Sequence, residues 1–355
     1  MSDLRINNIT DKTGGSGPVF AGVSTVTSTG AFTVPSGPTE YRGGRGRAIF
    51  AGGYVSGSAP SGWSSIMDYV EIATTGNATD FGDLKDRRYN VTGCASATRG
   101  LFMGGQGTPG ALFNTIDYVT ISSGGGASDF GDLNTSGSTA GKVQSGASTS
   151  NNTRGLYMGG HSPDTTAGSG GRQNIIQFIT IASTGDAADF GDMTVYSQGS
   201  QACASPTRAV RGAGAGNPAN QQVMDYVTIA TRGDAVSFGE LASILGLFPA
   251  TLSSTTRGIF AGGSTPTKLN TIEYITIATT GNATNFGDLT VITYGAGGSS
   301  NQVKGVVGGG GSPAGDRNQI NLITIASAGD ASDFGDLTTA RATVAGCSDS
   351  DGGLG

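Results

Sequence analysis

Short apolar runs alternate with glycine- and serine-rich segments along most of the chain. Runs such as residues 259–261 and 272–277 are apolar or β-branched on both alternating faces, which is typical of strands covered on both sides. Long amphipathic helical patterns are absent, and 63 of the 355 residues are glycine. The pattern predicts an all-β chain of short strands joined by tight turns.

A repeat of about 48 residues organises these strands. The block Phe-Gly-Asp-Leu, or a close variant of it, begins at Phe81, Phe130, Phe190, Phe238, Phe286 and Phe334. An isoleucine, a glycine and an alanine precede each block at constant spacing, as Ile277, Gly281 and Ala283 do. Further upstream a basic residue, such as Arg257, opens a short apolar run. Each repeat therefore predicts four antiparallel strands, with a glycine-containing hairpin turn between the third and the fourth.

Six four-stranded repeats predict a six-bladed β-propeller for residues 43–355. After the last repeat the chain adds one more first strand, residues 341–347, which is similar to residues 88–94. The first repeat begins at Arg47 and lacks this strand, so we expect the C-terminal strand to complete that blade and close the ring. Residues 1–42 lie outside the repeat and are predicted to form an extended attachment arm with short strands.

Charge excludes several classes of partner. The chain has 20 basic and 26 acidic residues, a net charge of −6, which is the wrong sign for binding nucleic acid or anionic lipid. The sequence also lacks a run of about 18 apolar residues, so we expect no membrane insertion. Cys94, Cys203 and Cys347 share one strand position of the repeat, which favours small core residues over a metal or redox role.

Motifs that carry chemistry are sparse. His161 is the only histidine, so a multi-histidine metal site cannot be assembled and a Ser-His-Asp set would require His161 itself. Asp-Phe-Gly recurs around the ring without the other motifs of a kinase. Residues 105–110 match G-x-G-x-x-G by letter, but Pro109 and the lack of a following helix indicate an ordinary loop.

Repeated carboxylates have a simpler structural interpretation. Pairs such as Asp80 and Asp83 recur in the blades, and we expect the aspartate of Phe-Gly-Asp-Leu to bond backbone amides or an arginine of a neighbouring blade. Asp349 and Asp351 form a weak calcium-binding pattern. We expect no catalytic residue, no cofactor and no metal, and hence no enzyme.

The loop between the second and third strands varies most in length, and variable loops on one face of a repeat scaffold commonly carry function. The candidate binding residues in these loops are Tyr54, Trp63, Phe113, His161, Arg172, Lys268 and Arg317. All of these loops should emerge on one face of the disc. Trp63, Tyr54 and Phe113 would there form a platform for sugars or a partner protein, or else simply pack the loops.

Residues 276–289, Thr-Ile-Ala-Thr-Thr-Gly-Asn-Ala-Thr-Asn-Phe-Gly-Asp-Leu, resemble the repeat of structural proteins from tailed phages of marine bacteria and cyanobacteria. Residues 7–14 similarly resemble the N-terminal arm by which virion proteins dock on a particle. The blades also resemble Kelch-type blades, with Gly262-Gly263 after the second strand and Tyr274 on the third. Kelch blades place a tryptophan where this chain has Phe286.

The phage resemblance implies a non-enzymatic virion protein that is assembled in the host cytoplasm and forms a homo-oligomer in the particle. Residues 1–42 would contact capsid or tail subunits, and the propeller would face outward as decoration or as an adhesion module for a host glycan or protein. Two alternatives stay open: a polysaccharide-active propeller enzyme, and a cellular Kelch-type interaction scaffold. The fold alone does not separate them.

Overall fold

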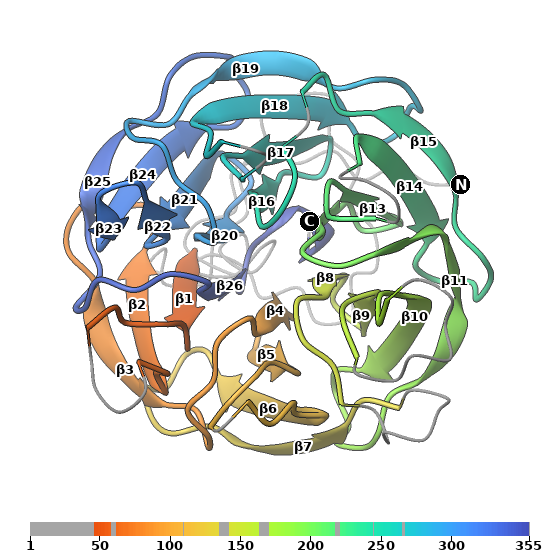
Figure 1. The fold of residues 1–355 in the computed structure, drawn as a ribbon, viewed down its shortest axis with the longest axis horizontal. Helices are drawn as coiled ribbons and strands as arrows, with labels where there is room; N and C mark the ends of the chain where they lie inside the picture. The colour runs from red at the N-terminus through yellow and green to blue at the C-terminus, as the bar shows by residue number, and fades with distance from the viewer. Residues whose placement is uncertain are drawn as a thin grey trace, which may run out of the picture. The chain divides into compact units, whose positions relative to one another are not determined.

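The computed structural model describes residues 46–354, apart from 58–61, 109, 135–141, 163–169, 217–220, 244 and 265–266. The predicted arm of residues 1–42 lies outside the described residues. Six four-stranded sheets stand as blades around a common axis (Figure 1). The protein is therefore a six-bladed β-propeller, as the repeat predicts.

In five blades the strands follow one another outward from the axis in chain order, and in the first blade the C-terminal strand takes the innermost place. The innermost strands are β26 (Ala345–Ser348), β4 (Thr92–Ala95), β8 (Ala147–Ser150), β12 (Gln201–Ala204), β16 (Ala250–Ser253) and β20 (Gly297–Ser300). The second strands are β1 (Arg47–Ala51), β5 (Arg99–Met103), β9 (Arg154–Met158), β13 (Arg208–Gly212), β17 (Arg257–Ala261) and β21 (Lys304–Gly308). The third strands are β2 (Ile66–Glu71), β6 (Thr115–Thr120), β10 (Gln173–Thr180), β14 (Val223–Thr228), β18 (Thr271–Thr276) and β24 (Gln319–Thr324). The outer strands are β3 (Thr79–Asp83), β7 (Ser128–Asp132), β11 (Ala188–Ser197), β15 (Val236–Glu240), β19 (Thr284–Asp288) and β25 (Ser332–Asp336).

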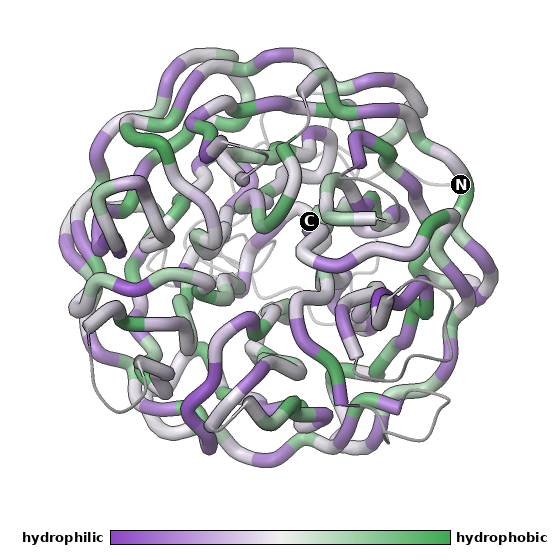
Figure 2. The backbone as a smooth tube through the Cα atoms, in the orientation of Figure 1, coloured by the Kyte–Doolittle hydropathy of each residue, from purple (hydrophilic) through white to green (hydrophobic). Residues whose placement is uncertain are grey.

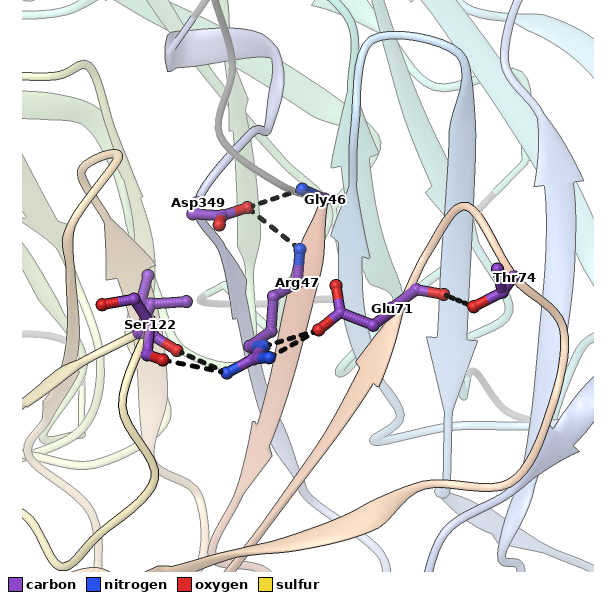
Figure 3. Close-up of polar contacts among 7 residues, drawn as sticks. Gly46, Arg47, Glu71, Thr74, Ser122 and Asp349 are labelled. Carbon is purple, nitrogen blue, oxygen red and sulfur yellow. Dashed lines mark hydrogen bonds and ion pairs between the residues drawn. The ribbon is translucent and has the colours of Figure 1, made fainter. Parts of the chain in front are cut away.

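The ring closes as predicted, because β26 completes the blade that begins with β1. These two strands pair antiparallel, with Ile49 opposite Cys347. Just beyond β26, Asp349 Oδ1 accepts the backbone N–H groups of Gly46 (2.9 Å) and Arg47 (3.0 Å) (Figure 3). Strand pairing and a carboxylate therefore hold the two ends of the propeller together.

The innermost strands begin later than the sequence suggests, at Thr92 and Ala345 rather than at residues 88 and 341. Two residues before each innermost strand the backbone has positive φ. The six residues are Asn90, Ser145, Gly199, Phe248, Gly295 and Thr343. This left-handed conformation breaks the extended run, and because four of the six residues are not glycine, the sequence does not mark the break at those four.

The core lies between the blades rather than within them. Six clusters of buried apolar side chains occur among the described residues, and each draws on two neighbouring blades. Hydrophobic and hydrophilic residues alternate in short stretches along the chain, and both occur at the periphery of the ring (Figure 2). The three cysteines are free and buried in these clusters, which confirms their prediction as core residues. A β-carbon added at Gly155 would lie 2.9 Å from Cys94 Sγ, so the thiol fills space left by a glycine of the next blade.

The outer strand of each blade is hydrogen-bonded to the turn of the following blade. The Gly233 amide donates to Phe190 O (2.9 Å) and the Ala235 amide to Asp192 O (2.7 Å). Equivalent pairs occur at all six seams, including the closing one, where the Gly76 amide donates to Phe334 O (2.9 Å). The donors are backbone amides, and the glycine of each pair is required for its positive φ, as at Gly233 (+149°).

The aspartate of Phe-Gly-Asp-Leu joins these seams through its backbone, not through its carboxylate as predicted. Its N–H donates to a side chain in the turn of the next blade, for example from Asp132 to Asp186 Oδ1 (3.0 Å). The turn residues that accept in this way are Asn77, Asp186, Asp234, Asn282 and Asp330. The prediction was wrong because a sequence does not show whether the backbone or the side chain of a residue makes a bond.

The basic residue that opens each second strand also crosses to the next blade. Arg47 Nη1 donates to Ile121 O (3.1 Å), and its guanidinium also binds Glu71 Oε1 (2.6 Å) (Figure 3). The guanidinium carbon lies 4.4 Å from the ring centroid of Tyr69, a favourable cation–π geometry. In the last blade Lys304 takes this position and donates to Ala73 O (3.4 Å).

Two glycines at one seam allow the effect of backbone strain to be distinguished from the effect of a steric clash. Gly191 (φ +151°) and Gly233 (φ +149°) share a conformation unfavourable for other residues, but only a β-carbon at Gly191 would meet backbone, 2.5 Å from Gly233 O. Both alanine variants should suffer the same backbone strain of about 1–3 kcal/mol. Gly191→Ala adds the clash with Gly233, so it should lower the unfolding free energy by about 2 kcal/mol more than Gly233→Ala does. Urea denaturation of both variants measures the difference. Equal losses of unfolding free energy would contradict the close contact between Gly191 and Gly233.

Candidate binding face

The two faces of the disc differ in the chain segments they carry. Because neighbouring strands are antiparallel, the loops between second and third strands lie on the same face as the connections between blades. We call this the loop face; the short turns within the blades form the opposite turn face. Isolated β-bridges join each connection to the loop of its blade, as between Tyr89 and Gln106, Gln144 and His161, and Tyr294 and Gly311.

The seven candidate residues all lie in segments of the loop face. Most stand at the bases of the loops, where the two arms of a loop meet. The β-bridges among them pair Tyr54 with Trp63, His161 with Arg172, and Ser264 with Lys268. The expected common face is therefore confirmed for these residues.

The ring contacts select a different aromatic group from the one predicted. Tyr54 meets Tyr89 edge-on with ring centroids 6.1 Å apart, and Trp63 lies 6.3 Å from Tyr89 at 32° between planes. Phe113 lies instead over the guanidinium of Arg88, 5.7 Å from the ring centroid. We call Tyr54, Trp63 and Tyr89 the aromatic cluster. Tyr89 was missed because its segment was assigned to an innermost strand.

Lys268 and Arg317 converge on the last blade. Lys268 Nζ donates to Ser312 O (3.0 Å) and lies 4.4 Å from the ring centroid of Tyr294. Arg317 Nε donates to Ser312 Oγ (3.0 Å). Ser312 belongs to a small hairpin formed by β22 (Gly311–Ser312) and β23 (Gly315–Asp316). Both side chains therefore stabilise this hairpin loop, and hydrogen bonds within the protein already occupy part of their donor capacity.

His161 is held in its neutral form. Burial lowers the pKa of its imidazole, and the positive charge of Arg172 lowers it further. A β-carbon added at Gly171 would lie 2.8 Å from His161 Nε2, so the imidazole packs closely on that glycine. Near neutral pH this side chain offers one donor and one acceptor rather than a positive charge.

A layer of buried acceptors lies beneath the loop face, which the sequence interpretation missed. A polar side chain stands four residues before the invariant isoleucine in every repeat: Asp68, Asp117, Gln177, Asp225, Glu273 and Asn321. Each accepts the backbone N–H of the residue that follows the Phe-Gly-Asp-Leu block of the preceding blade, as Asn321 Oδ1 does from Thr290 (3.1 Å). The sequence signal that could have revealed this layer is a hydrogen-bond acceptor at the same position in all six repeats.

Three of these acceptors are also paired with buried arginines. The N–O distances are 2.7 Å for Arg88 and Asp117, 2.7 Å for Arg211 and Asp225, and 2.8 Å for Arg341 and Asp68, and each of these side chains is at most 2% exposed. A buried charge is costly unless it is paired. These arginines therefore neutralise carboxylates that anchor the inter-blade connections.

The axial channel is too small to be a ligand site. Its lining is of small residues of the innermost strands, and its volume is about 50 Å³, enough for a few waters. Hydroxyls bridge neighbouring strands across it, as Ser300 Oγ donates to Ser253 O (2.8 Å). On the turn face it is covered by residues 349–354, which include a short 3-10 helix, η2 (Gly352–Leu354), with Leu354 buried.

Asp351 in this covering segment borders the channel. Burial raises the pKa of its carboxyl to about 7, although the amides of Gly353 and Leu354 act in the opposite direction. Asp351 Oδ1 accepts the Gly353 N–H (2.9 Å). Both carboxylates of the weak calcium-binding pattern thus bond backbone amides, and no group of three metal-ligating side chains occurs in the described part of the chain.

No protein-family model matches this chain, and the curated proteins contain no significant match. None of the described residues forms a helix long and apolar enough to cross a membrane.

Arg88→Met should strongly destabilise the protein, by about 3–5 kcal/mol, because Asp117 would remain buried without its cation. In the double variant, Asp117→Asn should restore most of the stability that Arg88→Met removes. Asn321 makes the equivalent bond between blades in the last blade without such an arginine. Arg87→Met, at the exposed neighbouring position, is the matched control and should change stability by less than about 0.5 kcal/mol. Chemical denaturation measures all three; failure of the second substitution to restore stability would contradict the pairing.

Asp351→Asn should stabilise the protein at pH 8.5 but not at pH 4. The raised pKa means that the folded state holds the proton more tightly than the unfolded state, so stability declines as pH rises from about 4 to about 7. Asparagine removes that decline, and the gain at high pH should reach about 2–4 kcal/mol. Thermal unfolding across this pH range tests it, and a gain independent of pH would rule out titration of this carboxyl.

Proposed function

We propose that this chain is a non-enzymatic structural component of a phage virion. Residues 1–42 anchor it to capsid or tail subunits, and the propeller is displayed with its loop face outward, as decoration or as a host-adhesion module. The resemblance of residues 276–289 to the repeat of phage structural proteins motivates the assignment. The Gly-Gly after the second strand and the aromatic residue on the third support Kelch-like ancestry of the blades.

One observation carries the proposed orientation: the chain enters the propeller on the face opposite the variable loops. Gly46 precedes β1 and lies beside Asp349, at the turn-face end of the first blade. The loop from 52 to 65 leaves the other end of β1. An attachment segment joined at Gly46 therefore starts on the turn face, which leaves the loop face available to a second partner.

The two faces also differ in regularity. The turns between third and outer strands all have the same length: 72–78, 121–127, 181–187, 229–235, 277–283 and 325–331. The loops between second and third strands vary: 52–65, 104–114, 159–172, 213–222, 262–270 and 309–318. A regular face suits a fixed role in assembly, whereas variable loops on a rigid scaffold suit recognition.

A non-enzymatic role is supported by how the polar groups are used. Repeated acceptors and cations are engaged in bonds between blades, as Asp186 and Arg47 are. The channel is narrow and covered at one end, so it offers no substrate cavity at the axis. Binding is therefore assigned to the loop face, and no catalytic residue is assigned.

The proposal predicts that the full chain copurifies with phage particles, and that a variant without residues 1–42 stays in the lysate. Mass spectrometry of purified particles and of the remaining lysate measures the partition. Tyr54→Ala, a change on the opposite face, is the control and should be incorporated normally. Recovery of the full chain in the lysate alone would overturn the virion assignment.

A further inference from the structure

We infer that the aromatic cluster of Tyr54, Trp63 and Tyr89 binds a neutral sugar. The inference deepens the proposed function, since it names a ligand class for the outward loop face. It rests on three features of the cluster: exposed aromatic surface, polar groups at its edge and a neighbouring arginine, Arg88, that is already paired.

The cluster presents aromatic surface that the core does not use. Tyr54 is 40% exposed, whereas the aromatic rings of the core, such as Phe102 and Phe260, are fully buried. Trp63 and Tyr89 are half-buried beside it. Trp63 Nε1 is buried and has no acceptor among the described residues. The cluster is thus positioned by ring contacts and by the β-bridge between Tyr54 and Trp63.

No other blade of the described structure has this combination at the corresponding bridges. Their loop-side positions are occupied by Gln106, His161, Ala215, Ser264 and Gly311. The fold therefore builds these bridges without an aromatic pair, and the bridge itself does not require Tyr54 and Trp63. Because the aromatic pair occurs at one bridge, it indicates recognition of a ligand rather than a structural requirement shared by all the blades.

The edge of the cluster is polar. The Tyr89 hydroxyl donates to Gln106 Oε1, and Gln106 Nε2 donates to Gly110 O (3.1 Å). The buried Arg88 nearby is neutralised by Asp117. Burial raises the pKa of Tyr89, and Tyr54 contributes in the same direction, so the phenol stays protonated at physiological pH.

A sugar matches these groups better than an ion or a purely apolar ligand. Its C–H face can pack on an aromatic ring, and its hydroxyls can bond the phenol and amide groups at the edge. The buried Arg88 is already paired with Asp117, so it offers no free positive charge to an anionic ligand. Because the surface is open, we expect weak binding by a single copy, strengthened when many copies act together on one particle.

Trp63 is the only tryptophan of the chain, so its fluorescence reports this site alone. A glycan array of neutral and acidic oligosaccharides identifies binders, and titration of the full-length protein with them should give a saturable change in Trp63 emission. Neutral sugars should produce it at millimolar or lower concentration. An array without binders, a preference for acidic sugars, or binding without any change in emission would overturn the inference.

Variants locate the interaction. Tyr54→Ala should weaken binding at least about tenfold, whereas Tyr54→Phe should retain most of it because the ring remains. Tyr196→Ala removes an equally exposed tyrosine on β11 and should leave binding unchanged. Equal effects of Tyr54→Ala and Tyr196→Ala would contradict the site, provided that thermal unfolding shows both variants folded.

The two proposals fail separately. If the protein is found in particles but Trp63 does not respond to any sugar, the sugar site is wrong and the virion assignment stands. If the sugar binds but the protein is absent from particles, the site stands and the virion assignment falls.

Discussion

The hydrogen bonds from the turn of one blade to the outer strand of the preceding blade are the constraint on which the ring depends. They require glycine where the two backbones meet, since a β-carbon at Gly191 would overlap the carbonyl of Gly233. They also bond part of each outer strand, whose edge would otherwise be open to pairing with another chain. The closing seam, from Gly76 to Phe334, is built like the others, and so the C-terminal strand completes a ring of equivalent joints.

Side chains strengthen the same joints at two further levels. Near the turn face, cations such as Arg47 reach a carbonyl of the following blade. Beneath the loop face, acceptors such as Asp117 and Asn321 hold the connection that arrives from the preceding blade. The loops add bonds between blades as well, as from Lys268 to Ser312. Their sequences nevertheless differ around the ring: one loop carries Tyr54 and Trp63 while another carries a hairpin.

The sequence predicted the architecture well because its strongest signals are the seam residues themselves. Repeated Phe-Gly-Asp-Leu blocks give the blade count, and the extra strand after Leu337 gives the closure. Local backbone conformation was not predictable in the same way: Asn90 and Thr343 adopt positive φ without being glycine. That conformation makes the innermost strand begin late and leaves Tyr89 in the connection on the loop face.

The candidate site was predicted in part for a related reason. Loop-length variation indicated the face on which we place the site, and residue type indicated Tyr54 and Trp63. Phe113 has the same chemistry, but its ring covers Arg88, and the buried pair of Arg88 and Asp117 has no local sequence signature. Contacts between segments from different blades decide which aromatic residues gather, and composition alone does not encode them.

The central claim is that the turn face is directed toward a particle and the loop face away from it. Cryo-electron microscopy of purified particles tests this directly, because a disc with a covered channel on one face can be oriented in density. We predict a propeller on the particle surface with Gly46 on the inner side and Tyr54 on the outer side. A disc with its loop face against the particle, or particles without the disc, would contradict the account.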